Sequence, residues 1–228
     1  MSERENILGR IREALRTAAP RPGGHGEGPA QTVAEPPVAH AREWLPAVGA
    51  SSEEQFELFA KNCADLKADF QRLAGRDEMK AALAKIRDAE KWQRIASHAG
   101  ELSNFACQAL GLPTLLTDQG YDVQALEKCD AGITECDALI AQTGGVVVTS
   151  RSTSGRALTI LPPHHVVIAR QDQLLPDLPS AFAFLQQKYA PDFPSMISFI
   201  TGPSRTGDIE RILVLGAHGP KKLTILCV

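Results

Sequence analysis

The sequence lacks the features that mark several large classes of protein. No apolar run approaches the roughly 20 residues that a membrane-spanning helix needs. The opening residues, MSERENILGRIREAL, mix acids and bases where a signal peptide has an apolar stretch. The net charge of −3 gives no general basic surface for nucleic acid or an anionic membrane. We therefore expect a cytoplasmic protein with no membrane span and no nucleic-acid partner.

Motifs for metal ions and common cofactors are also missing. The five cysteines are odd in number and no two have the CxxC spacing of iron–sulfur or zinc sites. There is no HExxH, GxGxxG or Walker pattern. We expect the cysteines to be small buried apolar side chains, and we expect this chain to bind no cofactor.

What is present indicates one globular domain with an appendage. Hydrophobic residues make up 43% of the 228 residues and charged residues 22%, which is ordinary for a globular protein. Residues 1–19 have apolar side chains at helical spacing, and residues 20–50 are rich in Gly and Pro. We predict an N-terminal helix, a flexible linker and an α/β domain over 51–228. The sequence leaves two alternatives for this helix, which can dock on its own domain or on another subunit.

Helical stretches and short apolar runs alternate through the rest of the chain. The periodicity predicts helices over 52–75, 77–89, 102–110, 125–128, 135–143 and 176–189. Strands are predicted over 92–97, 114–117, 131–134, 146–149 and 196–201, from His164 onward, and over 222–228. This alternation is typical of a mainly parallel sheet flanked by helices, in which ligands bind beyond the carboxyl ends of the strands.

Thr143, Gly144 and Gly145 form the first candidate binding segment. Paired glycines let the backbone approach a ligand closely, and their N–H groups suit an anion. The alternative is an ordinary tight turn from helix to strand. Arg156 belongs to a second candidate, SRSTSGR over 150–156, whose hydroxyls and guanidiniums suit a phosphate or carboxylate. Its alternative is a solvated loop.

The third candidate, TGPSRTGDIE, directly follows a predicted core strand. Backbone N–H groups and the Arg205 guanidinium of such a loop suit an anion. Its predicted ligand-binding residues are Thr201, Gly202, Ser204, Arg205 and Asp208. Asp208 has the alternative role of capping a following helical turn.

Glu135, at the start of the predicted 135–143 helix, is the candidate catalytic residue. A carboxylate there is a possible base or nucleophile, and the alternative is a first-turn acid that stabilises the helix dipole. His164 and His165 are neighbours in a predicted strand. They should face opposite sides of the sheet, so we do not expect them to bind one metal ion together.

Three sequence blocks carry a resemblance to a known family. AQTGGVVVTS, LTILPPHHVVIAR and ITGPSRTGDIERILVLGAHGPKKLTILCV resemble the LUD-domain family, in order, over Ser52 to Val228. Gly145 stands where the family more usually has Thr. The resemblance implies a fold similar to the NagB/RpiA/CoA-transferase-like proteins.

The resemblance also implies a metabolic role. Members of the family are implicated in oxidising L-lactate to pyruvate together with two iron–sulfur partner proteins. The iron–sulfur clusters are then expected in those partners, and this chain is expected to be an accessory or ligand-binding subunit for a small anionic metabolite. The alternative is a stand-alone enzyme of CoA-transferase-like fold that acts on a phosphorylated, CoA-linked or carboxylate metabolite.

Overall fold

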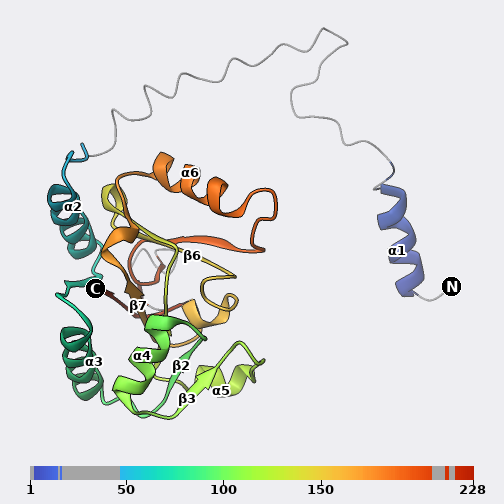
Figure 1. Ribbon diagram of the computed structural model, residues 1–228. Helices are drawn as coiled ribbons and strands as arrows, with labels where there is room; N and C mark the ends of the chain where they lie inside the picture. The colour runs from blue at the N-terminus through green and yellow to red at the C-terminus, as the bar shows by residue number, and fades with distance from the viewer. Residues whose placement is uncertain (1–2, 15, 17–46, 207–213, 216–218) are drawn as a thin grey trace, which may run out of the picture. The chain divides into compact units, whose positions relative to one another are not determined.

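The computed structural model describes residues 3–14, 16, 47–206, 214–215 and 219–228. The chain divides into two compact units, Met1–Trp44 and Leu45–Val228 (Figure 1). The first contains helix α1 (Glu3–Ala14). Most of the predicted 20–50 linker lies outside the described residues, and the three-part division made from the sequence stays a prediction.

A six-stranded parallel sheet forms the centre of the second unit. Its strand order is β1-β12-β7-β4-β2-β3, and every neighbouring pair is parallel. The strands are β1 (Asp69–Arg72), β2 (Ile95–Ser97), β3 (Thr114–Leu116), β4 (Ala131–Thr134), β7 (His164–Ala169) and β12 (Lys222–Cys227). The predicted α/β class with a mainly parallel sheet flanked by helices is confirmed.

A second sheet, which the sequence did not predict, packs on the first. Its order is β8-β5-β6-β9, from β8 (Leu174–Leu175), β5 (Ala138–Ile140), β6 (Gly145–Thr149) and β9 (Ile197–Ile200). Strand β6 is antiparallel to both β5 and β9. A short antiparallel hairpin, β10 (Arg205–Thr206) with β11 (Val214–Leu215), follows β9.

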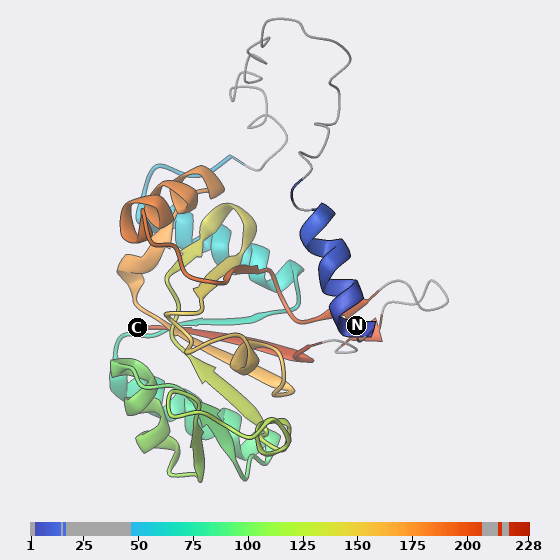
Figure 2. The same ribbon diagram turned by 90° about the vertical axis from the view of Figure 1, so that its right-hand side faces the viewer.

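The alternating side chains of β6 join the layers. Val147 packs with helix α6 (Leu178–Tyr189), whereas Val146 and Val148 pack against the large sheet. Figures 1 and 2 show the resulting layers. From one side to the other they are α6, the small sheet, the large sheet, and a last layer of α3 (Arg76–Glu90) and α4 (Glu101–Leu110). Helix α5 (Val123–Glu127) is close to β3.

Helix α2 (Ser52–Asp65) is shorter than the sequence predicts. Ser51 and Glu54 form a capping box at its start, as expected from Ser and an acid three residues later. The predicted continuation to Gly75 is wrong, because residues 69–72 form β1 beside β12. Phe70 lies 4.9 Å from the Phe59 ring, centroid to centroid, so its apolar contact with α2 mimics helical spacing in the sequence.

The predicted helix over 135–143 is also wrong. Residues 138–140 form β5, and Ala141–Thr143 form one 3-10 turn before β6. An apolar run this short fits a buried strand as well as a helix, and the strand forms because β6 and β8 pair with it on either side.

His164 and His165 face opposite sides of the large sheet, as predicted. The residues that alternate with His164, Val166 and Ile168, pack with α3 and α4, whereas Val167 packs with α2 and the small sheet. Each histidine therefore borders a different layer. In the part of the chain that the structure describes, no helix is long and apolar enough to cross a membrane.

Candidate functional site

The large sheet reverses its winding between β2 and β4. The chain passes from β2 outward to β3, then returns to β4 on the other side of β2 and continues to β7 and β12. Open α/β sheets bind ligands outside the carboxyl ends of the strands at such a point. The residues that follow β2, β4 and β7 therefore form the first place to look for a site.

Glu135 follows β4 directly and lies at this point. Its Oε1 accepts hydrogen bonds from Leu102 N at 2.8 Å and Ser103 N at 3.1 Å, two N–H groups of the first turn of α4 that have no partner within the helix. The N-cap residue of α4 is Gly100, which has no side chain to do this. Glu135 thus occupies the positive end of a helix dipole, but the helix is α4 and not the one predicted to begin at Glu135.

His98 holds the Glu135 backbone in place. It is 5% exposed. Its Nε2 accepts from Glu135 N at 3.0 Å, so Nδ1 carries the proton that it donates to Ala99 O at 3.1 Å. Sequence reasoning missed His98, although Ser-His-Ala-Gly after a predicted strand is a polar turn at a strand end.

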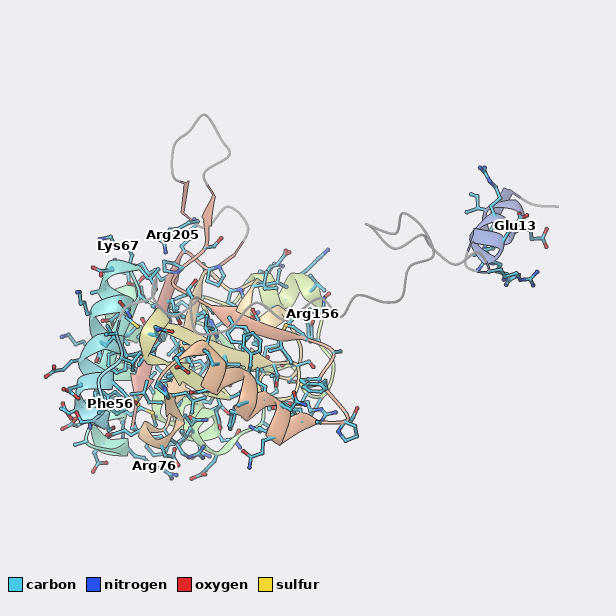
Figure 3. All side chains as sticks on the ribbon, turned by 90° about the horizontal axis from the view of Figure 1, so that it is seen from above. Glu13, Phe56, Lys67, Arg76, Arg156 and Arg205 are labelled. Carbon is cyan, nitrogen blue, oxygen red and sulfur yellow. The ribbon has the colours of Figure 1, made fainter. Side chains whose placement is uncertain are left out.

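A row of charges continues along the same edge. Glu101 forms ion pairs with Arg76 and with Arg170, which follows β7; the Arg170 pair measures 2.7 Å. Hydrogen bonds from Arg170 and then Arg76 lower the pKa of the Glu101 carboxyl. Figure 3 shows Arg76 at this edge and Lys67 at the opposite end of the molecule.

Beside Arg170 lies a hollow of about 330 Å³, here called the rim hollow. Its polar lining combines two cations, two carboxylates and an amide, and its apolar lining comes from β5, β8 and α6. The lining residues are Asp137, Ala138, Arg170, Asp172, Gln173, Leu175, Phe184 and Lys188. This size falls within the roughly 300–1,000 Å³ of small-molecule sites.

Asp137 is the buried charge of the rim hollow. Its side chain is fully buried, and Oδ1 accepts from Lys188 Nζ at 2.7 Å and Tyr189 Oη at 2.5 Å. Burial raises the pKa of the Asp137 carboxyl, but hydrogen bonds from Lys188, Ser152 and Tyr189 outweigh burial and lower the pKa overall. The carboxylate is therefore ionised at neutral pH. Sequence reasoning missed this group because its partners are 51 and 52 residues away.

The predicted segment Thr143-Gly144-Gly145 is packed against α2. Gly144 has φ of +62°, and a Cβ there would lie 2.9 Å from Asn62 Cβ and 3.0 Å from Cys63 N. Asn62 Nδ2 also donates to Ala141 O and Gln142 O. These contacts account for Gly144 through close packing on α2, and its left-handed φ closes the 3-10 turn before β6, which agrees with the tight-turn alternative. A ligand role for the three residues stays untested.

Two of the predicted residues, Gly202 and Ser204, line a second hollow of about 190 Å³. It lies between β9 and the large sheet, and its other lining residues are Thr159, Ile160, His165, Met196, Ser198, Ile200, Pro203, Gly219, Pro220 and Leu223. We call it the β9 groove. Most of these side chains are apolar, so the groove lacks the cationic character expected of an anion site.

The remaining predicted residues are spread over the molecule. Thr201 lies beside Gly145, because β6 and β9 pair in the register Val146↔Ile200. Arg205 Nη2 lies near Gly202, whereas Arg156 Nη2 donates to Ser195 O, before the start of β9. The structure thus brings 143–145 and 201–205 together at one end of the small sheet, but not Glu135 or Arg156. Asp208 lies outside the described residues.

No arrangement of side chains in the described residues suits a metal ion. Groups of three or more His, Cys, Asp or Glu in coordinating positions are absent from this part of the chain. The five cysteines are all free, and four of them are buried. Burial raises the pKa of the Cys63 thiol to about 12 and that of Cys227 to about 12, so neither is a thiolate at neutral pH.

The fold is that of a solved structure. The crystal structure of a DUF162 family protein from Deinococcus radiodurans matches with a TM-score of 0.61 at 22% identity, over 79% of this chain and 99% of the other. At this identity the match concerns the fold alone.

Similar proteins of known name share most of the chain. Lactate utilization protein C of Anoxybacillus flavithermus is 28% identical over 86% of this chain and 90% of its own length. The protein of the same name from Geobacillus sp. strain WCH70 is 28% identical over 94% of this chain and 93% of its own. The model of the LUD domain matches residues 117–228. The chain thus carries a LUD domain over these residues, which include β4 to β12 and both hollows.

Proposed function

We propose that this protein is a subunit of a lactate-utilisation system, in which it binds a small carboxylate and works with iron–sulfur partner proteins that carry electrons. The observation that carries the proposal is the similarity to proteins named lactate utilization protein C over 86% and 94% of the chain. Because the relatives are covered to 90% and 93% of their own length, the similarity concerns whole proteins and not one shared segment.

The rim hollow is the binding site in this proposal. Arg170 uses Nη2 on Glu101, and Lys188 uses one N–H on Asp137, so both cations keep further donors. An arginine fork and an ammonium group are well suited to a carboxylate. The amide of Gln173, whose Nε2 donates to Cys136 O, lies in the same wall. A 2-hydroxy acid would place its carboxylate between Arg170 and Lys188.

The oxidation of L-lactate to pyruvate releases two electrons and two protons, and an electron acceptor must receive them. The described residues of this chain present neither a metal-binding cluster nor paired cysteines. We therefore assign electron transfer to the iron–sulfur partners and ligand binding to this subunit.

The test combines binding with growth. Arg170→Ala and Lys188→Ala should weaken binding of L-lactate or pyruvate to the purified protein about tenfold each, measured by calorimetry. Lys80→Ala, an exposed change on α3 outside both hollows, is the matched control. In a deletion strain, the same two variants should fail to restore growth on lactate, whereas Lys80→Ala should restore it.

Association with the partners is tested separately. The full chain should retain the two iron–sulfur proteins of the lactate-utilisation system in a pull-down from cells grown on lactate. Normal growth of the deletion strain on lactate, together with no retained partner, would refute the proposal.

The position of Glu135 favours a second function, that of a stand-alone enzyme that acts on a CoA-linked or carboxylate metabolite. Glu135 is a carboxylate at the winding reversal of the sheet, where α/β enzymes place catalytic groups. In that case the purified chain alone should transfer CoA from an acyl-CoA thioester to a free carboxylate, which releases the first acyl group as its carboxylate, and Glu135→Gln should abolish turnover without loss of folding. Absence of turnover with the wild-type chain excludes this function.

A further inference from the structure

A third hollow lies at the amino ends of the strands, opposite the rim hollow. It has a volume of about 490 Å³ and lies between α3 and the strands β1, β12 and β7. We call it the lysine hollow. Its lining residues are Lys67, Asp69, Gln71, Lys85, Ile86, Ala89, Glu90, His164, Lys221, Lys222, Leu223 and Thr224. None of them lines the rim hollow, so the two are separate sites.

The sheet itself supplies a polar floor to the lysine hollow. In parallel register, Lys222 lies beside His164 and Asp69 lies beside Thr224. These four residues therefore project from one face of three adjacent strands. Farther along the same face the residues are Val166, Ile168 and Leu226, which pack with α3 and α4. Polar side chains thus occupy this corner of the sheet, although buried apolar side chains there would make the folded domain more stable.

The hollow is cationic although the whole chain is acidic. Four lysines line it against two carboxylates, whereas the net charge of the chain is −3. Lys222 Nζ is paired with both carboxylate oxygens of Glu90, at 2.5 and 2.7 Å. Lys67, Lys85 and Lys221 form no ion pair with the residues that the structure describes. Three ammonium groups are therefore available to an anion.

Lys67 occupies a position at which glycine is usual. It follows α2 and has φ of +65°, and its N–H donates to Ala64 O. A left-handed residue after a helix is most often glycine, because glycine adopts this φ without steric strain. Lysine at this position provides a charged side chain beside the hollow at a cost to the backbone. Figure 3 shows Lys67 at the end of α2, on the side of the molecule where Arg205 also lies.

His164 contributes a buried polar atom that lacks a partner. The residue is 5% exposed, and its Nε2 lies 2.9 Å from Thr224 Oγ1. Its Nδ1 is buried and has no hydrogen-bond partner among the described residues. Buried ring nitrogens are normally satisfied by protein or by bound water or ligand. The Lys222–Glu90 pair lies beside His164 in this hollow and in a smaller adjoining one.

We propose that the lysine hollow binds a phosphorylated small molecule, with Lys67, Lys85 and Lys221 on the phosphate oxygens and His164 Nδ1 as an additional partner. Several convergent ammonium groups suit the multiple charges of a phosphate ester or polyphosphate. A monocarboxylate carries a single negative charge, which is fewer than the three free ammonium groups of this hollow can neutralise. The site serves a ligand other than the small carboxylate of the rim hollow, and no bond is made or broken there.

Titration of the full chain with tripolyphosphate tests this proposal. Calorimetry at constant ionic strength should show saturable binding at one site. Lys85→Ala and Lys221→Ala should each weaken binding about tenfold, because a hydrogen bond to a charged group is lost. Lys80→Ala, on α3 but outside the hollow, should leave the affinity within twofold of wild type. Equal weakening by Lys80→Ala would indicate general charge attraction and overturn the proposal.

Further measurements test whether the ligand is a phosphate and whether it binds in the lysine hollow. Citrate, a carboxylate of similar charge, should bind at least tenfold more weakly than tripolyphosphate, and equal affinity would refute a phosphate site. The nitrogen-15 resonances of the His164 ring are assigned by comparison with the spectrum of His164→Gln, and they should shift when tripolyphosphate binds. Unchanged resonances would mean that the ligand binds elsewhere. Arg170→Ala should leave tripolyphosphate affinity unchanged, so this proposal and the proposed lactate role succeed or fail independently.

Discussion

The Glu135 carboxylate accepts the backbone N–H of Leu102, 33 residues earlier in the chain, at 2.8 Å. This single contact joins the carboxyl end of β4 to the amino end of α4. It places a protein carboxylate where α/β folds commonly hold a bound anion. The contact gives Glu135 a structural role that can be measured whether or not it has a chemical one.

Replacing Glu135 should therefore destabilise the fold. Glu135→Ala leaves Leu102 N and Ser103 N without an acceptor and should lower the free energy of unfolding by about 1–2 kcal/mol. Glu135→Gln keeps an acceptor oxygen and should cost less. Urea denaturation measures both, with the exposed Glu57→Ala as a control. Equal stability of Glu135→Ala and wild type would mean that α4 needs no cap from β4.

Two glycines with nearly equal φ distinguish backbone strain from close packing. Gly111 has φ of +63° and open space around it, whereas Gly144 has φ of +62° and contacts Asn62 and Cys63. Gly111→Ala should cost about 1 kcal/mol of stability from the left-handed backbone alone. Gly144→Ala should cost about 1–3 kcal/mol more, because an added methyl overpacks the contact with α2. Similar losses for both would show that α2 moves away freely.

The buried ion pair of the rim hollow should contribute more than an exposed one. Asp137→Ala leaves Lys188 and Tyr189 without their shared acceptor, and we expect a loss of about 2–4 kcal/mol, less than for a fully buried pair because Lys188 is 44% exposed. The pair Arg151–Asp192, 46% and 87% exposed, serves as the comparison. Asp192→Ala should cost less than about 1 kcal/mol in the same denaturation assay.

Two buried histidines should make the fold sensitive to acid. Burial lowers the pKa of His164 to about 4 and that of His165 to about 3. Unfolded histidine titrates near pH 6.5, so between about pH 6.5 and 4 the unfolded chain binds protons that the folded chain does not. Stability should fall by about 1.4 kcal/mol per pH unit for each histidine as the pH decreases through this range, and above it the histidines contribute no pH dependence.

The variant His165→Gln checks the assignment. It removes one titrating group and should flatten the stability profile by about 1.4 kcal/mol per pH unit below pH 6.5. Urea denaturation at half-unit steps from pH 7.5 to 4.5 gives the slope. A profile with an unchanged slope would mean that His165 becomes protonated in the folded state.

Local patterns in the sequence predicted the elements that form by local rules. The 101–110 and 76–90 helices end in left-handed residues, Gly111 and Lys91, and their apolar spacing is regular. Phe70 was misassigned because the spacing to Phe59 and Phe56 continues a helical period, while the pairing of β1 with β12 depends on residues 155 positions away. No local sequence pattern predicts that strand pairing.

The same limit applies to the site. Glycines and hydroxyl residues favoured a ligand role for 143–145 and 201–208, whereas Gly144 packs closely against α2 and Gly202 packs against Leu66 at its end. The groups that converge in space, Asp137 with Lys188 and Tyr189, or His164 with Lys85 and Lys67, come from separate segments and have no common motif. Polar residues at strand ends, such as His98 and Glu135, were the signal that sequence alone offered.

The position of β12 has a consequence for synthesis of the protein. Residues 222–227 pair with β1 on one side and β7 on the other, so a strand that is synthesised after both of them joins two parts of the sheet made earlier. Until then, β1 and β7 expose open edges and the apolar side chains that later surround Ile225 and Leu226. The growing chain must keep these edges from pairing with other molecules, and the large sheet is complete only after β12 has been synthesised.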